Sequence, residues 1–248
     1  MRKLFLFVAI LLLTQRASAT FTTSQHRSAT GCSGTSCTVT GFTAIAAGSM
    51  VVGIGFGDTS IVPSAGSSNA GTWTVPSGCS ATSNCLSTNT SAGGVLLEYI
   101  LSSTGSPTSV IVTSSAGNFT AVEVLVFTFT SGPVSFDSGG TANRTTNCTT
   151  CAGITTTVTG NDLIVQAITC AQTCATSGTA GFVGASPYVT TSGGVNDFPA
   201  GDGVGAAINQ SSGTAPNWAQ SPTGNAAVTA IAFKESSGTV KTMPPVVY

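Results

Sequence analysis

The stretch Val95-Leu96-Leu97-Glu98-Tyr99-Ile100-Leu101 is the part of the chain from which the fold follows most directly. Successive side chains of a β-strand point to opposite faces, so alternate residues of this stretch share a face. One face carries Val95, Leu97, Tyr99 and Leu101, and the other carries Leu96, Glu98 and Ile100. The stretch therefore predicts a strand that is apolar on one face and interrupted by a single carboxylate on the other.

Similar strand signals recur along the chain, whereas the helical spacing of apolar residues is nearly absent after residue 19. Short runs rich in Val, Ile, Thr and Phe predict strands at 37–45, 50–55, 94–101, 109–113, 121–130, 153–158, 163–169 and 226–233. Many short strands with polar turns in a chain of 248 residues indicate an all-β protein. We expect a two-sheet antiparallel β-sandwich with a jelly-roll-like arrangement.

The first 19 residues have the pattern of a signal peptide. Arg2 and Lys3 precede the apolar run Leu4–Leu13, and Ala17-Ser18-Ala19 follows as a cleavage site. The apolar run is too short to cross a bilayer, which takes about 20 residues. We therefore expect a chain that is secreted, or located at the cell surface or in the periplasm, with no membrane insertion after cleavage.

The expected organisation has four parts, which are a signal peptide (1–19), a flexible N-terminal segment (20–36), a β-sandwich domain (37–236) and a C-terminal tail (237–248). Charged residues make up 6% of the chain, where about 25% is usual. Loss of the leader would remove three of the seven basic residues and leave an acidic excess. This balance excludes nucleic acid as a partner. The low charge is typical of a secreted β-protein, or of a surface that contacts a polysaccharide or a second copy of the chain.

Two pairs of segments echo each other. The segment 47–54 is echoed by 160–167, and 117–122 is echoed by 224–228. Each first segment includes a predicted strand start. The echoes indicate a domain built from two similar halves, or a coincidence in a sequence of low complexity.

Six short motifs together resemble those of secreted bacterial β-sandwich domains of unknown function. They are Gly48-Ser49-Met50, Gly71-Thr72-Trp73-Thr74, Glu98-Tyr99, Phe129-Thr130-Ser131-Gly132, Asn161-Asp162-Leu163 and Ala232-Phe233-Lys234. The resemblance covers most of residues 38–235. The chain departs from it at Thr128, where an acidic residue is usual. The resemblance implies a jelly-roll-like sandwich and supplies no activity.

The eight cysteines form four pairs that are close in sequence, namely Cys32/Cys37, Cys79/Cys85, Cys148/Cys151 and Cys170/Cys174. Export places them where disulfides form and persist, so we expect local disulfides. Cross-paired disulfides between the last two pairs, or a zinc ribbon at these four residues, are the alternatives. A redox-active Cys148-x-x-Cys151 would need a helix at its first thiol, and its flanks predict loop and strand instead.

Catalytic groups are few. The single histidine, His26, lies in the expected flexible segment. Glu98 and Glu123 lie inside predicted strands, and two carboxylates on one face of a sheet would suit a glycoside hydrolase. Asn196, Asp197 and Asp202 form a weak candidate calcium site without the spacing of a calcium-binding loop. No motif implies a cofactor, because no helix follows the glycine-rich run 53–57 to receive a phosphate.

Trp73 and Trp218 are the candidate ligand-binding residues. Both lie in polar, turn-rich surroundings, where an exposed indole would stack on a sugar ring. The alternative is that each indole packs at an end of the sandwich, because tryptophan buries a large area. We therefore expect a non-catalytic exported protein for binding, adhesion or surface structure, with a glycan hydrolase or a self-assembling fibre or coat subunit as alternatives.

Overall fold

The computed structural model describes residues 21–79, 85–130, 132–139, 143–152, 154–156, 162–176, 202–210 and 217–235. These ranges form antiparallel β-strands joined by turns, and they contain no helix, so none that could cross a membrane. The predicted all-β antiparallel class is therefore confirmed. Within the same ranges the strands form four separate sheets instead of two.

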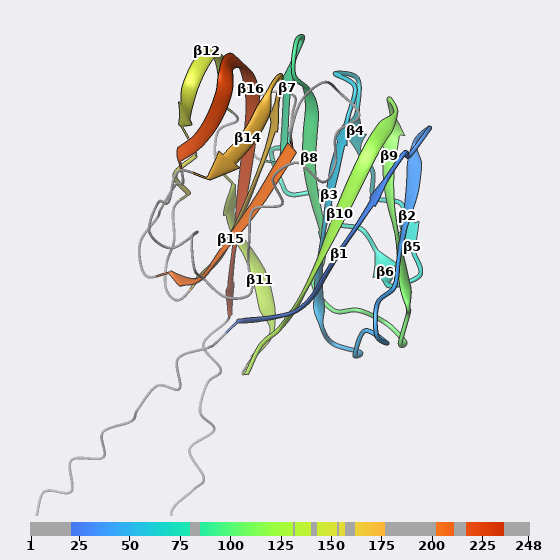
Figure 1. The fold of residues 1–248 in the computed structure, drawn as a ribbon. Helices are drawn as coiled ribbons and strands as arrows, with labels where there is room; N and C mark the ends of the chain where they lie inside the picture. The colour runs from blue at the N-terminus through green and yellow to red at the C-terminus, as the bar shows by residue number, and fades with distance from the viewer. Residues whose placement is uncertain are drawn as a thin grey trace, which may run out of the picture.

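A five-stranded sheet, here called the central sheet, organises the molecule (Figure 1). In spatial order it contains β1 (Thr22–Thr30), β10 (Phe119–Thr128), β3 (Met50–Gly57), β8 (Gly93–Ile100) and β7 (Leu86–Asn89). Every residue of β3 and β8 is buried. Burial of both faces explains why apolar residues are continuous along these strands instead of alternating with polar ones.

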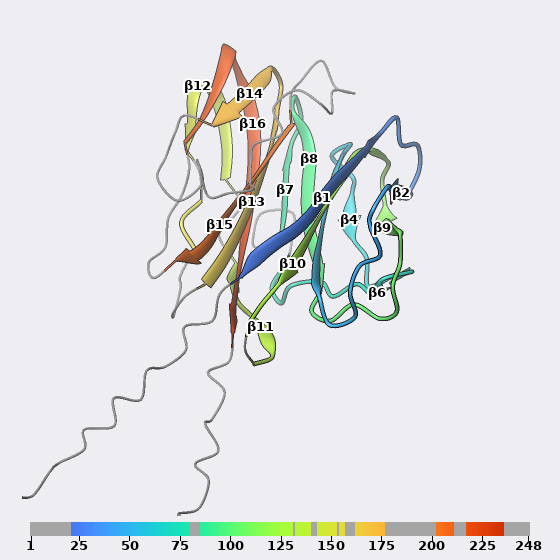
Figure 2. The same ribbon diagram turned by 60° about the horizontal axis from the view of Figure 1, so that its bottom comes forward.

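The central sheet lies between two other layers in both views (Figures 1 and 2). On one side is the outer sheet, formed by β2 (Ser36–Thr40), β9 (Ser109–Ala116) and β4 (Val62–Pro63), with the small hairpin β5 (Ser67–Ser68) and β6 (Gly71–Thr72) beside it. On the other side is the C-terminal sheet, formed by β11 (Val134–Gly139), β16 (Asn217–Glu235), β13 (Asp162–Cys170) and β15 (Asp202–Gln210), with β12 (Asn143–Ala152) and β14 (Thr173–Thr176) paired to β16.

Two consecutive residues of β8 show how the faces of the central sheet are used. Glu98 accepts a hydrogen bond from the backbone N–H of Thr113 in the outer sheet, at 3.4 Å. Tyr99 packs against rings of the C-terminal sheet, with its centroid 5.0 Å from that of Phe233 and 5.9 Å from that of Phe136. Alternation along β8 thus directs odd residues toward the C-terminal sheet and even residues toward the outer sheet.

Glycines of β3 make room for large side chains on the outer-sheet side. A Cβ at Gly53 would lie 2.8 Å from Cη2 of Trp73, and one at Gly55 would clash with the ring of Phe119. The glycine-rich run 53–57 is thus the middle and end of a buried strand, and aromatic rings from elsewhere in the chain take the side-chain space at Gly53 and Gly55.

The sequence echoes coincide with a matching strand order in two sheets. In the central sheet β3 lies between β10 and β8, with β1 beyond β10. In the C-terminal sheet β13 lies between β16 and β15, with β11 beyond β16. Met50 pairs with Phe127 in the first sheet, and Leu163 pairs with Phe233 in the second. The two halves of the chain therefore build sheets of the same order.

The structure corrects two expectations about individual segments. The segment 20–36, expected to be flexible, contains β1, which pairs with β10 from Thr22 to Thr30. The strand expected at 153–158 is absent from its described part, since residues 154–156 belong to no strand. Residues 1–20 and 236–248 lie outside the described ranges, so the expected signal peptide and C-terminal tail remain predictions.

Three of the four predicted local disulfides are confirmed. Cys32 bonds to Cys37, Cys79 to Cys85 and Cys148 to Cys151, with Cα–Cα distances of 5.6, 5.2 and 5.2 Å. Cys170 is also disulfide-bonded, and the side chain of Cys174 is not among those described. The zinc-ribbon alternative is wrong, because two of its four thiolates are bonded to each other. The Cys32–Cys37 bridge fastens the corner where the chain passes from β1 to the outer sheet.

Candidate functional site

Glu98 and Glu123, the two candidate catalytic acids, lie on opposite faces of the central sheet. Glu98 pairs with Gly53 of β3, whereas Glu123 pairs with the next residue, Ile54. Since neighbouring residues of a strand point to opposite faces, the two carboxyl groups point away from each other. The paired-carboxylate hydrolase hypothesis is therefore wrong, because a sheet separates its acid from its partner.

Glu98 is a buried acid that has no counter-charge among the described residues. Its side chain is fully buried, and its carboxyl group accepts backbone hydrogen bonds from Thr113 and Ser64. Gly53, Val122 and Val124 are its neighbours on the same face of β3 and β10. Burial raises the pKa of the Glu98 carboxyl well above its ordinary value of 4.5, although the two hydrogen bonds lower it in part. This arrangement favours a neutral carboxylic acid between the central sheet and the outer sheet.

The raised pKa of Glu98 predicts a contribution to stability that is largest in acid. Above the ordinary pKa of 4.5, the folded chain keeps a proton that the unfolded chain has lost. The stabilisation is complete below that value and is lost as the pH rises through the raised pKa. The Glu98 contribution to the free energy of unfolding should fall over this window by up to about 1.4 kcal/mol per pH unit.

Urea unfolding of the wild-type chain and of Glu98→Gln, measured from about pH 4 to about pH 9, isolates this contribution. The glutamine variant lacks the titrating group, so the stability difference between the two proteins should change with pH in the direction stated. A difference that stays constant over the whole range would show that Glu98 titrates in its ordinary range.

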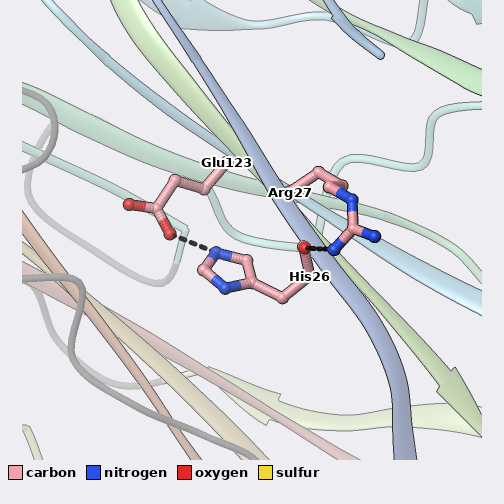
Figure 3. Close-up of polar contacts among 3 residues, drawn as sticks. All are labelled: His26, Arg27 and Glu123. Atoms are coloured by element: carbon pink, nitrogen blue, oxygen red, sulfur yellow. Dashed lines mark hydrogen bonds and ion pairs between the residues drawn. The ribbon is translucent and has the colours of Figure 1, made fainter. Parts of the chain in front are cut away.

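Glu123 contacts His26 across the edge of the central sheet. The Nε2 atom of His26 on β1 lies 2.8 Å from Oε2 of Glu123 on β10, and Figure 3 shows the imidazole directed at the carboxylate. Glu123 is fully buried, and the His26 side chain is 27% exposed. Glu123 shares its face with Ile54, so the pair lies on the side of the central sheet toward the C-terminal sheet.

Sequence reasoning missed this pair because β1 has no apolar alternation. Its residues, Thr-Thr-Ser-Gln-His-Arg-Ser-Ala-Thr, carry no strand signal. The one local sign of order is the Cys32/Cys37 pair, which ties the segment to a predicted strand. The order of β1 comes from its ladder with β10, which lies about 100 residues further along the chain.

A double-mutant cycle on His26 and Glu123 is expected to reveal coupling between them. His26→Ala removes a hydrogen bond from a buried carboxyl group and should lower the free energy of unfolding by about 1–3 kcal/mol. The loss should shrink when Glu123 is already Gln, giving a coupling energy of about 0.5–3 kcal/mol.

Ser28 provides the matched control for this cycle, because it pairs with Glu123 in the ladder and its side chain is exposed. Ser28→Ala should change stability by less than about 0.5 kcal/mol. Additive effects of the His26 and Glu123 substitutions would contradict the coupling.

The outer edge of β1 is covered by its own side chains. Arg27 donates from Nη1 to the carbonyl oxygen of His26 (Figure 3) and from Nε to that of Gly41. Gln25 donates from Nε2 to the carbonyl oxygen of Thr43. The first contact occupies one backbone carbonyl group of β1, and the other two hold residues 41–43 beside the strand, which counters the addition of a strand from a second molecule.

Both tryptophans are buried. Trp73 is 1% exposed and donates from Nε1 to the carbonyl oxygen of Ile111, at 2.8 Å. Trp218 is fully buried and donates from Nε1 to Oε1 of Gln166, at 3.0 Å, within a second apolar cluster that includes Cys148 and Cys151. Neither indole can stack on a sugar ring in this structure. The alternative prediction, that each indole packs in the interior, is therefore confirmed, and each buried indole N–H has a hydrogen-bond acceptor.

The candidate calcium site is not assembled in the part of the chain that the structure describes. Asn196 and Asp197 lie outside the described residues, and Asp202 begins β15 with its side chain not described. The described residues contain no group of three or more His, Cys, Asp and Glu side chains that could hold a metal ion.

Comparison with protein families, curated proteins and solved structures finds no match for this chain. The resemblance to secreted bacterial β-sandwich domains therefore stays a prediction that rests on the sequence motifs alone.

Proposed function

We propose that the chain is an exported, non-catalytic β-sandwich that acts in extracellular binding, adhesion or surface structure. The observation that carries this proposal is the placement of Glu98 and Glu123, both fully buried and on opposite faces of one sheet. The acids best placed for catalysis thus belong to two separate interior layers. Because both acids lie in the interior, a partner would contact other residues, on the surface of the folded chain.

The disulfides support the exported part of the proposal. Three local bridges indicate an oxidising environment, such as the periplasm or the cell exterior. The covering of the central sheet on both faces supports a sandwich architecture, and we retain a jelly-roll-like arrangement as part of the proposal. The finer location, secreted or bound to the cell surface, follows from the leader pattern alone.

A weakly polar polymer such as a polysaccharide is the partner that the surface fits best. The chain is 6% charged, and the edge strand β2 exposes Ser36, Thr38 and Thr40. Hydroxyl groups can donate to and accept from sugar hydroxyls without a net charge. Because Trp73 and Trp218 are buried, recognition would rest on such hydroxyl and amide groups instead of on aromatic stacking.

Adsorption to polysaccharides tests the binding proposal. The purified full-length chain is mixed with insoluble polysaccharides and applied to a glycan array, with a reduced and unfolded sample as control. We expect the folded chain to be retained on at least one polymer and the unfolded control to be washed away. No retention on any polymer, together with a silent array, would overturn the glycan-binding form of the proposal.

Self-association is tested by light scattering after size-exclusion chromatography. A second copy of the chain is the alternative partner, and the covered edge of β1 argues against strand addition at that edge. A monomer that persists at high concentration would remove the fibre or coat-subunit alternative. A concentration-dependent polymer would favour it over polysaccharide binding.

A further inference from the structure

Glu98 meets two other polar residues, Thr113 of β9 and Ser64 of the loop that follows β4. The backbone N–H of Thr113 donates to Oε1 of Glu98 at 3.4 Å, and the backbone N–H of Ser64 also donates to this carboxyl group. The second carboxyl oxygen, Oε2, is buried and has no hydrogen-bond partner among the described residues. One carboxyl oxygen of Glu98 thus accepts a hydrogen bond from the protein, and the other accepts none from the described residues.

Thr113 carries a second buried oxygen that lacks a hydrogen-bond partner among the described residues. This oxygen is Oγ1 of its hydroxyl group. The residue facing it is Gly66, where a Cβ would lie 2.6 Å from Oγ1 of Thr113 and 3.1 Å from Oγ of Ser64. A side chain at position 66 would overlap the Thr113 hydroxyl, so glycine allows the loop to pack closely against both hydroxyl groups.

Two buried polar atoms without partners are costly, at about 1–3 kcal/mol each. Buried polar groups that the protein does not satisfy are commonly satisfied by an internal water, which makes about three hydrogen bonds. We propose that Glu98, Thr113 and Ser64 form an internal binding site for one water molecule, enclosed by Gly66. The water links Oε2 of Glu98 to the hydroxyl of Thr113, and the hydroxyl of Ser64 is the third partner.

Water suits this site better than a cation does. The residues that share the face of Glu98 on β3 and β10, Gly53, Val122 and Val124, offer no oxygen ligand from a side chain. A hard cation takes six or more oxygen ligands and is held mainly by carboxylates. One neutral acid and two hydroxyl groups match instead the mixed donor and acceptor needs of a water molecule. This site is independent of the surface binding proposed above.

A high-resolution crystal structure of the full chain tests the site directly. We expect ordered density within hydrogen-bond distance of both Oε2 of Glu98 and Oγ1 of Thr113. A direct hydrogen bond between these two atoms with no density between them would overturn the proposal. An anomalous signal at this position after a soak with rubidium would also overturn it, because it would identify a cation.

Magnetic relaxation dispersion of solvent nuclei tests the same site in solution by counting long-lived waters. Thr113→Val keeps the side-chain shape and removes one partner, so this variant should lose one long-lived water relative to the wild-type chain. Thr38→Val is the matched control, because Thr38 is an exposed threonine of the neighbouring strand β2 and should change nothing. An unchanged count in Thr113→Val would contradict the site.

Discussion

A chain carrying Glu98→Lys is expected not to fold. Lysine would place an ammonium group in a fully buried site whose same-face neighbours on β3 and β10 are Gly53, Val122 and Val124. An isolated buried charge is among the few changes that cost more than about 4 kcal/mol, a large part of the stability of an ordinary domain. Soluble yield, circular dichroism and a urea transition measure the outcome.

Two variants control for this result. Glu98→Gln keeps the shape and remains neutral, so it should fold with a transition close to that of the wild-type chain. Val62→Lys introduces the same ammonium group at a side chain that is 42% exposed, and it should change stability by less than about 0.5 kcal/mol. A cooperative transition of Glu98→Lys near the wild-type midpoint would mean that this site is open to water.

Replacement of Trp73 by alanine should lower the free energy of unfolding by about 3–5 kcal/mol. The indole is 1% exposed, lies against Gly53 of β3 and donates from Nε1 to the carbonyl oxygen of Ile111. Its loss opens a cavity between the central and outer sheets and leaves the carbonyl group of Ile111 without this donor. Urea unfolding monitored by circular dichroism gives the change.

Trp73→Phe separates packing from hydrogen bonding, because phenylalanine keeps much of the buried area and lacks the N–H group. Its loss should be clearly smaller than that of Trp73→Ala. A loss below about 1 kcal/mol in the alanine variant would instead be the behaviour of a surface residue, and it would restore Trp73 as a candidate for ligand contact.

The stretch 95–101 shows which structural features local sequence predicts and which it does not. Its alternation correctly predicts a strand and correctly separates Glu98 from Tyr99. It cannot show that both faces are covered, because the covering sheets come from residues 36–40, 109–116 and 134–235. It also cannot show the register between β8, β3 and β10. A shift of one residue in that register would place Glu123 on the face of Glu98, so the hydrolase hypothesis depended on information that local sequence does not contain.

The predictions of a flexible segment at β1 and of exposed tryptophans were wrong for a related reason. β1 is held by pairing with β10 and by the Cys32–Cys37 corner, and its own residues give little preference for any structure. Trp73 lies in a polar local sequence, and its burial follows from contact with Gly53 and with Ile111. By contrast, the disulfides were predictable because short spacing alone brings the paired residues within reach.

The most direct test of a non-catalytic function measures binding and turnover in one experiment. Wild-type chain, Glu98→Gln and Glu123→Gln are each incubated with a panel of polysaccharides, and the bound fraction and the released reducing ends are recorded. The account predicts retention on at least one polymer with no release of reducing ends by any of the three proteins. Release by the wild-type chain that is lost in either glutamine variant would contradict it, because one of these buried carboxyl groups would then act in catalysis.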